Sequence, residues 1–178
     1  MVLATCLGNN SRFPLGFFKA SGCGGTGFLG KYIQQSLITA HEVISLSRNN
    51  ADINADLSKQ IPVLPPVDLV VHCAGKAHSV PLNDADRQAF FEVNVQGTSN
   101  LLKAIELGNQ LPKYFVLIST VAVYGCEIGQ LINENHPLNA TDAYGKSKIE
   151  AEKLVQEWCA QNHITCSILR LPLLVGTN

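Results

Sequence analysis

A glycine-rich segment near the amino end of this 178-residue chain leads directly into a helical pattern. Gly24, Gly27 and Gly30 are spaced three apart, and apolar residues then recur at every fourth position over residues 29–37. That period is typical of a helix. A glycine turn that opens a helix lets backbone N–H groups approach a pyrophosphate at the positive end of the helix. The segment therefore indicates a dinucleotide-binding turn, and the alternative is a flexible glycine loop.

The residues before this turn, at 17–23, are expected to form the first strand of a sheet. Ser21 and Gly22 stand where a buried parallel strand usually has Val or Ile, so the strand is expected to be weak. Residues 1–16 contain two Gly, one Pro and two consecutive Asn, without a sustained period. They predict an irregular extension, and the lack of a basic leader argues against a signal peptide.

Beyond the turn, strand-like and helical segments alternate. The run at 67–74 is almost continuously apolar, as expected of a central parallel strand buried on both faces. Helical patterns cover 84–106 and 142–162, and Thr141 or Asp142 can cap the second of them. The other segments of strand composition are 41–48, a short one at 52–57, 114–120 and 164–171. This order predicts a single α/β domain with a doubly wound parallel sheet.

Composition and charge exclude several classes of protein. Hydrophobic residues make up 46% of the chain and charged residues 15%, which indicates a globular domain with a sizeable core. The formal net charge of -1 gives no electrostatic reason to expect nucleic acid or an anionic membrane as a partner. No apolar run approaches the roughly 20 residues that a membrane-spanning helix needs.

The six cysteines include no Cys-x-x-Cys pair, and several lie in apolar, strand-like segments. They are therefore interpreted as small core residues of a protein in a reducing compartment, the cytoplasm. The five histidines show no spacing that suits a metal site, so no metal is expected.

The end of the second strand bears on the choice of dinucleotide. Ser47 and Arg48 stand where an acidic residue would favour the ribose 2′-hydroxyl of NAD and an arginine would accommodate the 2′-phosphate of NADP. The sequence therefore favours NADP slightly over NAD, with an ordinary surface arginine as the alternative. Asp56, after the short third strand, is a candidate acceptor for the adenine amino group.

One polar residue interrupts the apolar face of the 84–106 helix. Asn94 shares that face with Phe90, Thr98, Leu101, Leu102 and Ile105. It is either a satisfied buried amide or an amide that orders the neighbourhood of a catalytic site.

A tyrosine and a lysine begin the second long helix. Tyr144 and Lys148 are four residues apart, so both side chains emerge on one face. A nearby cation favours the phenolate form of a tyrosine whose ordinary pKa is roughly 10, and the pair can then transfer protons near neutral pH. Many helices carry this spacing by chance. Thr120 ends a strand whose carboxyl edge faces the same way, and this gives the pair a hydroxyl partner.

Together these features resemble the extended short-chain dehydrogenase/reductase family, which contains the nucleotide-sugar epimerases and dehydratases. The matching segments are 24–30, 72–75, 93–98, 118–125, 144–148 and 169–172. The resemblance implies a Rossmann-like fold over residues 17–178. It also implies that the family's C-terminal, substrate-binding part is absent from this chain, and that the first strand is a degraded version of the family's.

The resemblance implies a role for each candidate residue. Tyr144 would be the catalytic acid/base, Lys148 would lower its pKa and bind the nicotinamide ribose, and Thr120 would hydrogen-bond the reacting sugar hydroxyl. Ser119 is the fallback for Thr120. The residues expected to bind the cofactor are Gly24, Gly27, Phe28, Leu29, Gly30, Ser47, Arg48, Asp56, Leu57, Ala74, Gly75, Lys76, Asn94, Tyr144 and Lys148.

The implied reaction is the epimerisation of a nucleotide sugar, 4-epimerase-like, in which hydride moves to NAD or NADP and returns to the other face of a keto-sugar. Dehydratases of the family carry Asp-Glu directly after the threonine, whereas Val121 and Ala122 stand here, which argues against a dehydratase. The alternatives are an NADP-dependent reductase of a keto-sugar or small carbonyl compound, and a non-catalytic dinucleotide-binding module. The expected partners are a nucleotide sugar and, through the two long helices, a second copy of the chain.

Overall fold

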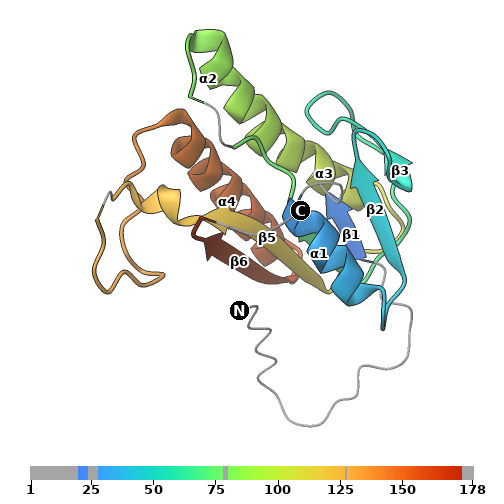
Figure 1. Cartoon of the computed structure of the whole chain (residues 1–178). Coiled ribbons are helices and arrows are strands. Elements are labelled where there is room, and N and C mark those ends of the chain that lie inside the picture. Colours follow the sequence, from blue (N-terminus) through green and yellow to red (C-terminus); the bar gives the residue numbers. More distant parts are fainter. Residues whose placement is uncertain (1–19, 24–27, 78–79, 127, 174–178) are drawn as a thin grey trace.

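The computed structural model describes residues 20–23, 28–77, 80–126 and 128–173, with side chains from residue 28 onward. These residues form one parallel sheet of six strands with helices packed against it (Figure 1). Across the sheet the strands are β3 (Ile53–Asn54), β2 (Val43–Ser47), β1 (Ala20–Cys23), β4 (Leu69–His72), β5 (Tyr114–Thr120) and β6 (Thr165–Leu171). The predicted doubly wound parallel sheet is therefore confirmed.

The helices follow the predicted order along the chain. They are α1 (Phe28–Leu37), α2 (Asp84–Phe91), α3 (Gly97–Glu106) and α4 (Ala143–Gln161), with the π-helical turn η1 (Glu92–Gln96) and the 3₁₀ turn η2 (Val121–Tyr124). The helix expected at 84–106 is thus continuous, but η1 interrupts its α-helical hydrogen bonding, which the periodicity did not predict. The segment 52–57 forms the expected short third strand at Ile53–Asn54, and Asp56 and Leu57 follow it in the loop.

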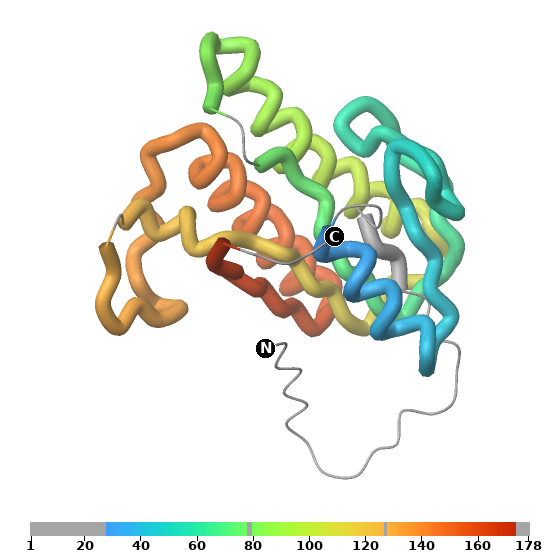
Figure 2. Tube along the Cα trace, in the orientation of Figure 1, coloured from blue at the N-terminus to red at the C-terminus, as the bar shows by residue number. Residues whose placement is uncertain are grey.

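The sheet is built in two directions from its central strands. The connection from β1 to β2 runs one way, and the connections from β4 to β5 and from β5 to β6 run the other. Right-handed crossovers therefore place α1 on one face, against β1 and β2, and α2, α3 and α4 on the other. Figure 2 shows the blue-to-cyan part of the chain at one side of the sheet and the yellow-to-red part at the other.

The central strand β1 is held by pairing on both edges. Its four residues pair with β2 and with β4, so that Ala20 lies between Val43 and Leu69. The strand expected at 17–23 is therefore confirmed from residue 20 onward, and residues 17–19 lie outside the described part. Two flanking ladders of backbone hydrogen bonds hold a strand that the sequence marks as weak.

The main core lies between the sheet and the helices α3 and α4. Phe115, Leu101 and Val155 have no exposed surface, and the Phe115 ring meets the Trp158 ring edge-on with the centroids 6.0 Å apart. Trp158 donates its indole N–H to the Glu106 carboxylate at 2.7 Å. This core fixes α4, and with it the residues at the start of α4, against the middle of the sheet.

The described cysteines are free thiols with different surroundings. Cys159 is buried and packs with Cys166 against the main core. Cys126 is exposed, so the interpretation of the cysteines as core residues does not hold for it.

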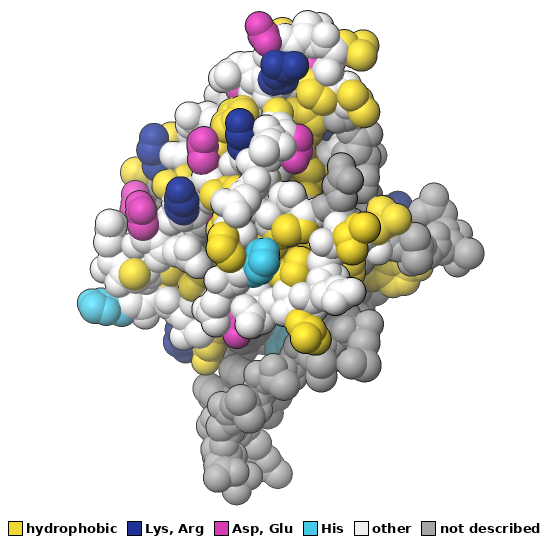
Figure 3. Space-filling view, turned by 90° about the vertical axis from the view of Figure 1, so that its left-hand side faces the viewer, with side chains coloured by type: hydrophobic (Ala, Val, Ile, Leu, Met, Phe, Trp, Pro, Cys, Tyr) yellow, Lys and Arg dark blue, Asp and Glu magenta, His cyan; other side chains and the backbone are white. Residues whose placement is uncertain are grey.

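The surface drawn in Figure 3 mixes both signs of charge. Basic and acidic side chains lie near one another on this face, and hydrophobic side chains occur in scattered groups. This face offers no broad basic area that would attract a polyanion. Among the described residues, no helix combines the length and the apolar character that crossing a bilayer requires.

We expect Phe115→Ala to lower the free energy of unfolding by about 3–5 kcal/mol, because it leaves a cavity between the sheet and α4. Urea titration followed by the fluorescence of Trp158, the single tryptophan of the chain, measures the loss directly. Leu107→Ala is the matched control, because Leu107 is 77% exposed and should change the value by less than about 0.5 kcal/mol. Equal losses for the two variants would contradict the packing described here.

Candidate active site

The loops that follow β2, β4 and β5 meet at one edge of the sheet, because the carboxyl ends of parallel strands lie together. The start of α4 reaches the same edge. Asp142 caps that helix by accepting the backbone N–H of Gly145 at 2.9 Å, and the backbone N–H of Ala140 bonds the carbonyl oxygen of Val123 in η2. These contacts bring the end of β5 and the first turn of α4 together.

A cavity of about 660 Å³ opens at this edge, beside the ends of β2 and β4. Its volume lies within the range of small-molecule sites. Residues predicted to bind the cofactor line it from the loops after three different strands, namely Ser47, Arg48, Asp56, Leu57, Ala74, Gly75 and Lys76. The structure therefore gathers these sequence-predicted residues into one site.

The wall of the cavity at Gly75 leaves no room for a side chain. A Cβ at this position would lie 3.1 Å from Oδ1 of Asn94 and 4.0 Å from Nζ of Lys148. Glycine thus lets the backbone that lines the cavity lie directly against the helix and close to the lysine. These residues fit an extended dinucleotide, with Arg48 beside one end and Gly75 next to Lys148 at the other.

Asn94 joins three segments at this point. Its Oδ1 accepts the backbone N–H of Lys76 at 2.7 Å, and its Nδ2 donates to the carbonyl oxygen of Lys76 at 3.2 Å and to Oγ of Ser147 at 2.9 Å. Ser147 in turn donates to the carbonyl oxygen of Tyr144 at 2.7 Å. Asn94 is 2% exposed and is a satisfied buried amide that ties the cavity loop to the start of α4, while its role in ordering a catalytic site stays a prediction.

The π-helical turn η1 surrounds Asn94. Turns of this kind insert one extra residue into a helix and often occur at functional sites. Here the carbonyl oxygen of Asn94 accepts the hydroxyl of Thr98 at 2.6 Å, and that hydroxyl also meets Nε2 of His72 at 2.9 Å. Because this bond uses the backbone carbonyl of Asn94, the side-chain amide remains available to bond Lys76 and Ser147.

Lys148 is buried and anchored to the sheet. It is 5% exposed, and its ammonium donates to the carbonyl oxygen of Ile118 in β5 at 2.8 Å. Burial lowers the pKa of Lys148 to about 8, while the carboxylate of Glu152, one turn further along α4, acts in the opposite direction. The lysine therefore titrates within the physiological range instead of carrying a permanent charge.

Tyr144 lies beside Thr120 and the ring of Phe90. Its phenol is hydrogen-bonded to the Thr120 hydroxyl, and its ring centroid is 6.1 Å from that of Phe90. Burial raises the pKa of Tyr144 above its ordinary value, the Thr120 hydrogen bond lowers it, and the Asp142 carboxylate raises it further. The expected lowering of this pKa by Lys148 is not observed, because burial outweighs the other influences and the ammonium of Lys148 bonds Ile118.

Gly145 allows the close approach of α4 to η2. A Cβ at Gly145 would lie 2.4 Å from the Cβ of Ala140 and 3.1 Å from the carbonyl oxygen of Ala122. Any larger residue would push the first turn of α4 away from β5, and with it Tyr144 away from Thr120.

The nucleotide end of the cavity is formed by the loops after β2 and β3. Arg48 is exposed there and its charge helps to lower the pKa of Asp56, although the main cause is the hydrogen bond from the Ser58 hydroxyl. The Asp56 carboxylate accepts that hydroxyl at 2.7 Å and the backbone N–H of Ser58 at 3.1 Å. Ser47 is buried, and its hydroxyl donates to the carbonyl oxygen of Asn49 at 2.6 Å.

The glycine-rich turn is only partly visible. Gly24 and Gly27 lie outside the described residues. Phe28, Leu29 and Gly30 form the first turn of α1, where Gly30 is the buried residue of the helix, but none of the three lines the cavity. Their predicted contacts with the cofactor therefore stay predictions.

Several residues of the cavity wall were missed by the sequence analysis. They are Leu46, Asn49, Asn50, Ala55, Ser58, His72, Cys73 and Val93. Asn50 has a positive φ of 57°, and an Asn-Asn pair directly after Ser47-Arg48 was a usable signal for a tight turn at the ribose end. The position of His72 in the matching segment 72–75 gave no indication of its contacts.

His72 is a buried neutral imidazole. It is 2% exposed, and burial, assisted by the charge of Lys148, lowers its pKa to about 3. Nε2 meets the Thr98 hydroxyl, while Nδ1 has no hydrogen-bond partner among the described residues. This histidine therefore adds no charge to the cavity at physiological pH.

The fold and this edge of the sheet define a dinucleotide-binding α/β protein. The family model "NAD dependent epimerase/dehydratase family" matches residues 23–178, and the chain belongs to that family. The resemblance drawn from the sequence motifs is thereby confirmed.

Similarity to individual proteins agrees with this assignment. The chain is 32% identical to a UDP-glucose 4-epimerase of Vibrio cholerae over 86% of this chain and 51% of that protein. It is 33% identical to a GDP-6-deoxy-D-mannose reductase of Pseudomonas aeruginosa, and the match covers 75% of this chain and 44% of that protein. The structure of RMD from Pseudomonas aeruginosa complexed with NADPH superimposes with a TM-score of 0.70 at 26% identity, covering 89% of this chain and 55% of that chain. The chain thus spans about half the length of the curated relatives it matches.

We expect Asn94→Ala to weaken both the fold and the site. Loss of the amide leaves the Lys76 N–H and the Ser147 hydroxyl without their partner, which should lower the free energy of unfolding by about 1–3 kcal/mol. The affinity for NADH, measured by nicotinamide fluorescence, should fall as well, because the cavity loop loses its anchor. Gln96→Ala, in the exposed part of the same π turn, is the control and should leave that affinity unchanged. An unaltered NADH affinity in Asn94→Ala would show that the amide is structural only.

Proposed function

We propose that this chain is the cofactor-binding part of an NAD(P)-dependent enzyme that epimerises a nucleotide sugar in the manner of a 4-epimerase. The observation that carries the proposal is the position of Lys148 beside Gly75 of the cavity wall, with Tyr144 one helical turn earlier on α4 and Thr120 beside the tyrosine. The 32% identity with a UDP-glucose 4-epimerase supports it.

The proposed reaction needs a group that removes a proton from a sugar hydroxyl and later returns it. The bound nicotinamide cofactor supplies the acceptor and donor of hydride. Tyr144 is the proton acceptor, and Thr120 holds the phenol through its hydrogen bond. The hydroxyl of Thr120 also accepts the backbone N–H of Ala122 at 3.2 Å, which holds the threonine side chain in place and leaves its own proton free to be donated.

Lys148 supports the proton transfer by its charge. An ammonium has three N–H donors, and the contact with Ile118 uses one of them. The remaining donors serve the nicotinamide ribose. The positive charge of the ammonium also stabilises the phenolate of Tyr144. Both groups of this pair sit on one helical turn that is held against β5, so the geometry is fixed before substrate arrives.

The residues after Thr120 favour epimerisation over dehydration. Val121 is 44% exposed and Ala122 has no ionisable group, so this turn lacks the carboxylates that water elimination would use. The reductase alternative draws support from Arg48 at the nucleotide end and from the 33% identity with a mannose-derivative reductase. The dimer expected through the two long helices stays a prediction.

We expect the whole protein to interconvert epimers of a nucleotide sugar with no net change in cofactor absorbance at 340 nm. Tyr144→Phe should lower kcat by about 10²–10⁴-fold while the chain still binds NADH, because only the proton acceptor is removed. Tyr32→Phe, on the exposed side of α1, is the control and should keep wild-type turnover. Net consumption of NADPH would favour the reductase instead. Full activity in Tyr144→Phe would show that Tyr144 is not a catalytic residue.

We expect the chain to bind NADP somewhat more tightly than NAD. Arg48 stands at the nucleotide end of the cavity, and a charge-assisted contact with the 2′-phosphate is worth about tenfold in affinity or more. Arg48→Ala should therefore weaken NADP binding about tenfold and leave NAD binding nearly unchanged in parallel titrations. Equal losses for the two cofactors would mean that the guanidinium does not meet the 2′-phosphate.

A further inference from the structure

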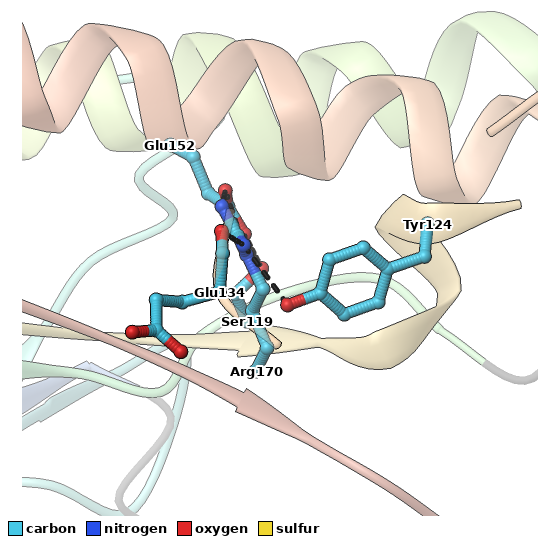
Figure 4. Close-up of polar contacts among 5 residues, drawn as sticks. All are labelled: Ser119, Tyr124, Glu134, Glu152 and Arg170. Carbon is cyan, nitrogen blue, oxygen red and sulfur yellow. Dashed lines mark hydrogen bonds and ion pairs between the residues drawn. The ribbon is translucent and has the colours of Figure 1, made fainter. Parts of the chain in front are cut away.

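A buried carboxylate stands one helical turn beyond Lys148. Glu152 is 1% exposed, and its Oε1 accepts the hydroxyl of Ser119, the residue before Thr120, at 2.5 Å. Arg170 reaches the same carboxylate from β6, with Nη2 2.8 Å from Oε2 and Nε 3.2 Å from both oxygens. Figure 4 shows Glu152 pointing from α4 toward the guanidinium above the ends of the two strands.

The other side of the guanidinium faces η2 and the loop after it. Nη1 of Arg170 donates to the hydroxyl of Tyr124 at 3.0 Å and to the carbonyl oxygen of Glu134 at 2.9 Å. The guanidinium carbon lies 5.1 Å from the centroid of the Tyr124 ring. Figure 4 shows the Tyr124 hydroxyl aimed at Arg170, while the carboxylate of Glu134 points away. Arg170 therefore connects α4 with the segment that follows Thr120.

Stability alone does not account for this arrangement. A buried ion pair gains little over a well-packed apolar pair, because both charges lose their hydration. Here both members of the pair are hydrogen-bonded, and two of the groups they touch flank the proposed active site: Ser119 precedes Thr120, and Tyr124 ends the turn that begins after Thr120. The position of the pair is therefore suited to holding the residues of the proposed active site in a fixed geometry.

We propose that Glu152 and Arg170 form a positioning pair for the proposed active site: the carboxylate, one helical turn beyond Lys148, holds the end of β5, and the guanidinium holds the turn after Thr120. The inference rests on the proposed function, because it concerns the lysine and threonine assigned to that reaction. Neither residue of the pair touches the cavity, so each acts through its neighbours.

The charge of Lys148 is set by few groups. The groups whose charge acts on it are Glu152, one turn further along α4, and Cys73, in the loop after β4; the charge of Lys148 acts in turn on His72, and Arg170 of β6 pairs with Glu152. The pKa of His72 is about 3 and that of Cys73 about 11, so neither changes charge near pH 8. Tyr144, with its raised pKa, stays neutral there too. Glu152 is thus the group that opposes the effect of burial on the lysine.

The test follows the affinity for NADH across pH, which needs no sugar substrate. If the ammonium of Lys148 holds the nicotinamide ribose, wild-type affinity is full below the pKa of Lys148 and falls as pH rises through about 8. Glu152→Gln keeps the shape of the side chain and removes its charge. The midpoint of the fall should then move down by about one pH unit or more.

Two further variants separate charge from structure. Glu157→Gln removes an exposed carboxylate from the same helix and should leave the midpoint in place. Glu152→Asp keeps the charge and should return the midpoint to within a few tenths of the wild-type value. Should Glu152→Gln fail to fold, the double variant Glu152→Gln/Arg170→Gln removes both buried charges together, and the midpoint should still move down, but by less than in Glu152→Gln, because the positive charge of Arg170 is lost as well.

A folded Glu152→Gln variant with a wild-type midpoint would overturn the inference, whatever its loss of thermal stability, because the pair would then be structural only. An equal shift in Glu157→Gln would overturn it too. Failure of the proposed function gives a different result: Tyr144→Phe would retain turnover in the whole protein, while the midpoint of Glu152→Gln would still move. The two proposals are therefore tested by separate measurements.

Discussion

All six strands of the sheet run parallel, so every strand releases its chain at the same edge, and the candidate site depends on this constraint. The direction of winding reverses between β1 and β4, and the loops on the two sides of this reversal diverge and leave a cavity between them. Residues separated by a hundred positions in sequence, such as Arg48 and Lys148, thereby share one site. A short β1 is sufficient for this role, because its neighbours supply hydrogen bonds on both edges.

The same edge concentrates buried polar groups, and each of them is anchored to a strand of the sheet or to a loop beside it. Asn94 bonds the loop after β4, Lys148 bonds the backbone of β5, and Glu152 bonds β5 and β6. A buried polar group is tolerated only when its partners are present, so these contacts leave each side chain a single orientation. The polar layer that adds little to stability is what fixes the positions of the candidate catalytic groups.

Sequence patterns predicted the parts of this structure that depend on local period. The helix at 84–106 and its buried face, including Asn94, follow from apolar spacing, and the central strand at 67–74 follows from its continuous apolarity. The π turn around Asn94 was not predicted, because it depends on the register of backbone hydrogen bonds and not on side-chain type.

Contacts between distant segments were beyond the reach of those patterns. The pairing of Glu152 with Arg170 joins positions 18 residues apart on a helix and a strand, and neither position shows it alone. The spacing of Tyr144 and Lys148 correctly placed both near one edge, but it said nothing of burial. Burial raises the pKa of the Tyr144 phenol and lowers the pKa of the Lys148 ammonium. Spacing specifies which face a side chain occupies, whereas the medium around it depends on everything packed there.

The two opposed pKa directions decide how the proposed site can work. A neutral Tyr144 is ready to give a proton to a keto-sugar, and it can take one from a sugar hydroxyl only if its phenolate is stabilised. Epimerisation requires both steps in each turnover. The Thr120 hydroxyl is the group that lowers the pKa of the phenol in this structure, and the proposed role of Lys148 adds the charge of the ammonium to that effect. Under this proposal, the charge of Lys148 near neutral pH depends on Glu152, because its carboxylate counteracts the burial of the lysine without lining the cavity.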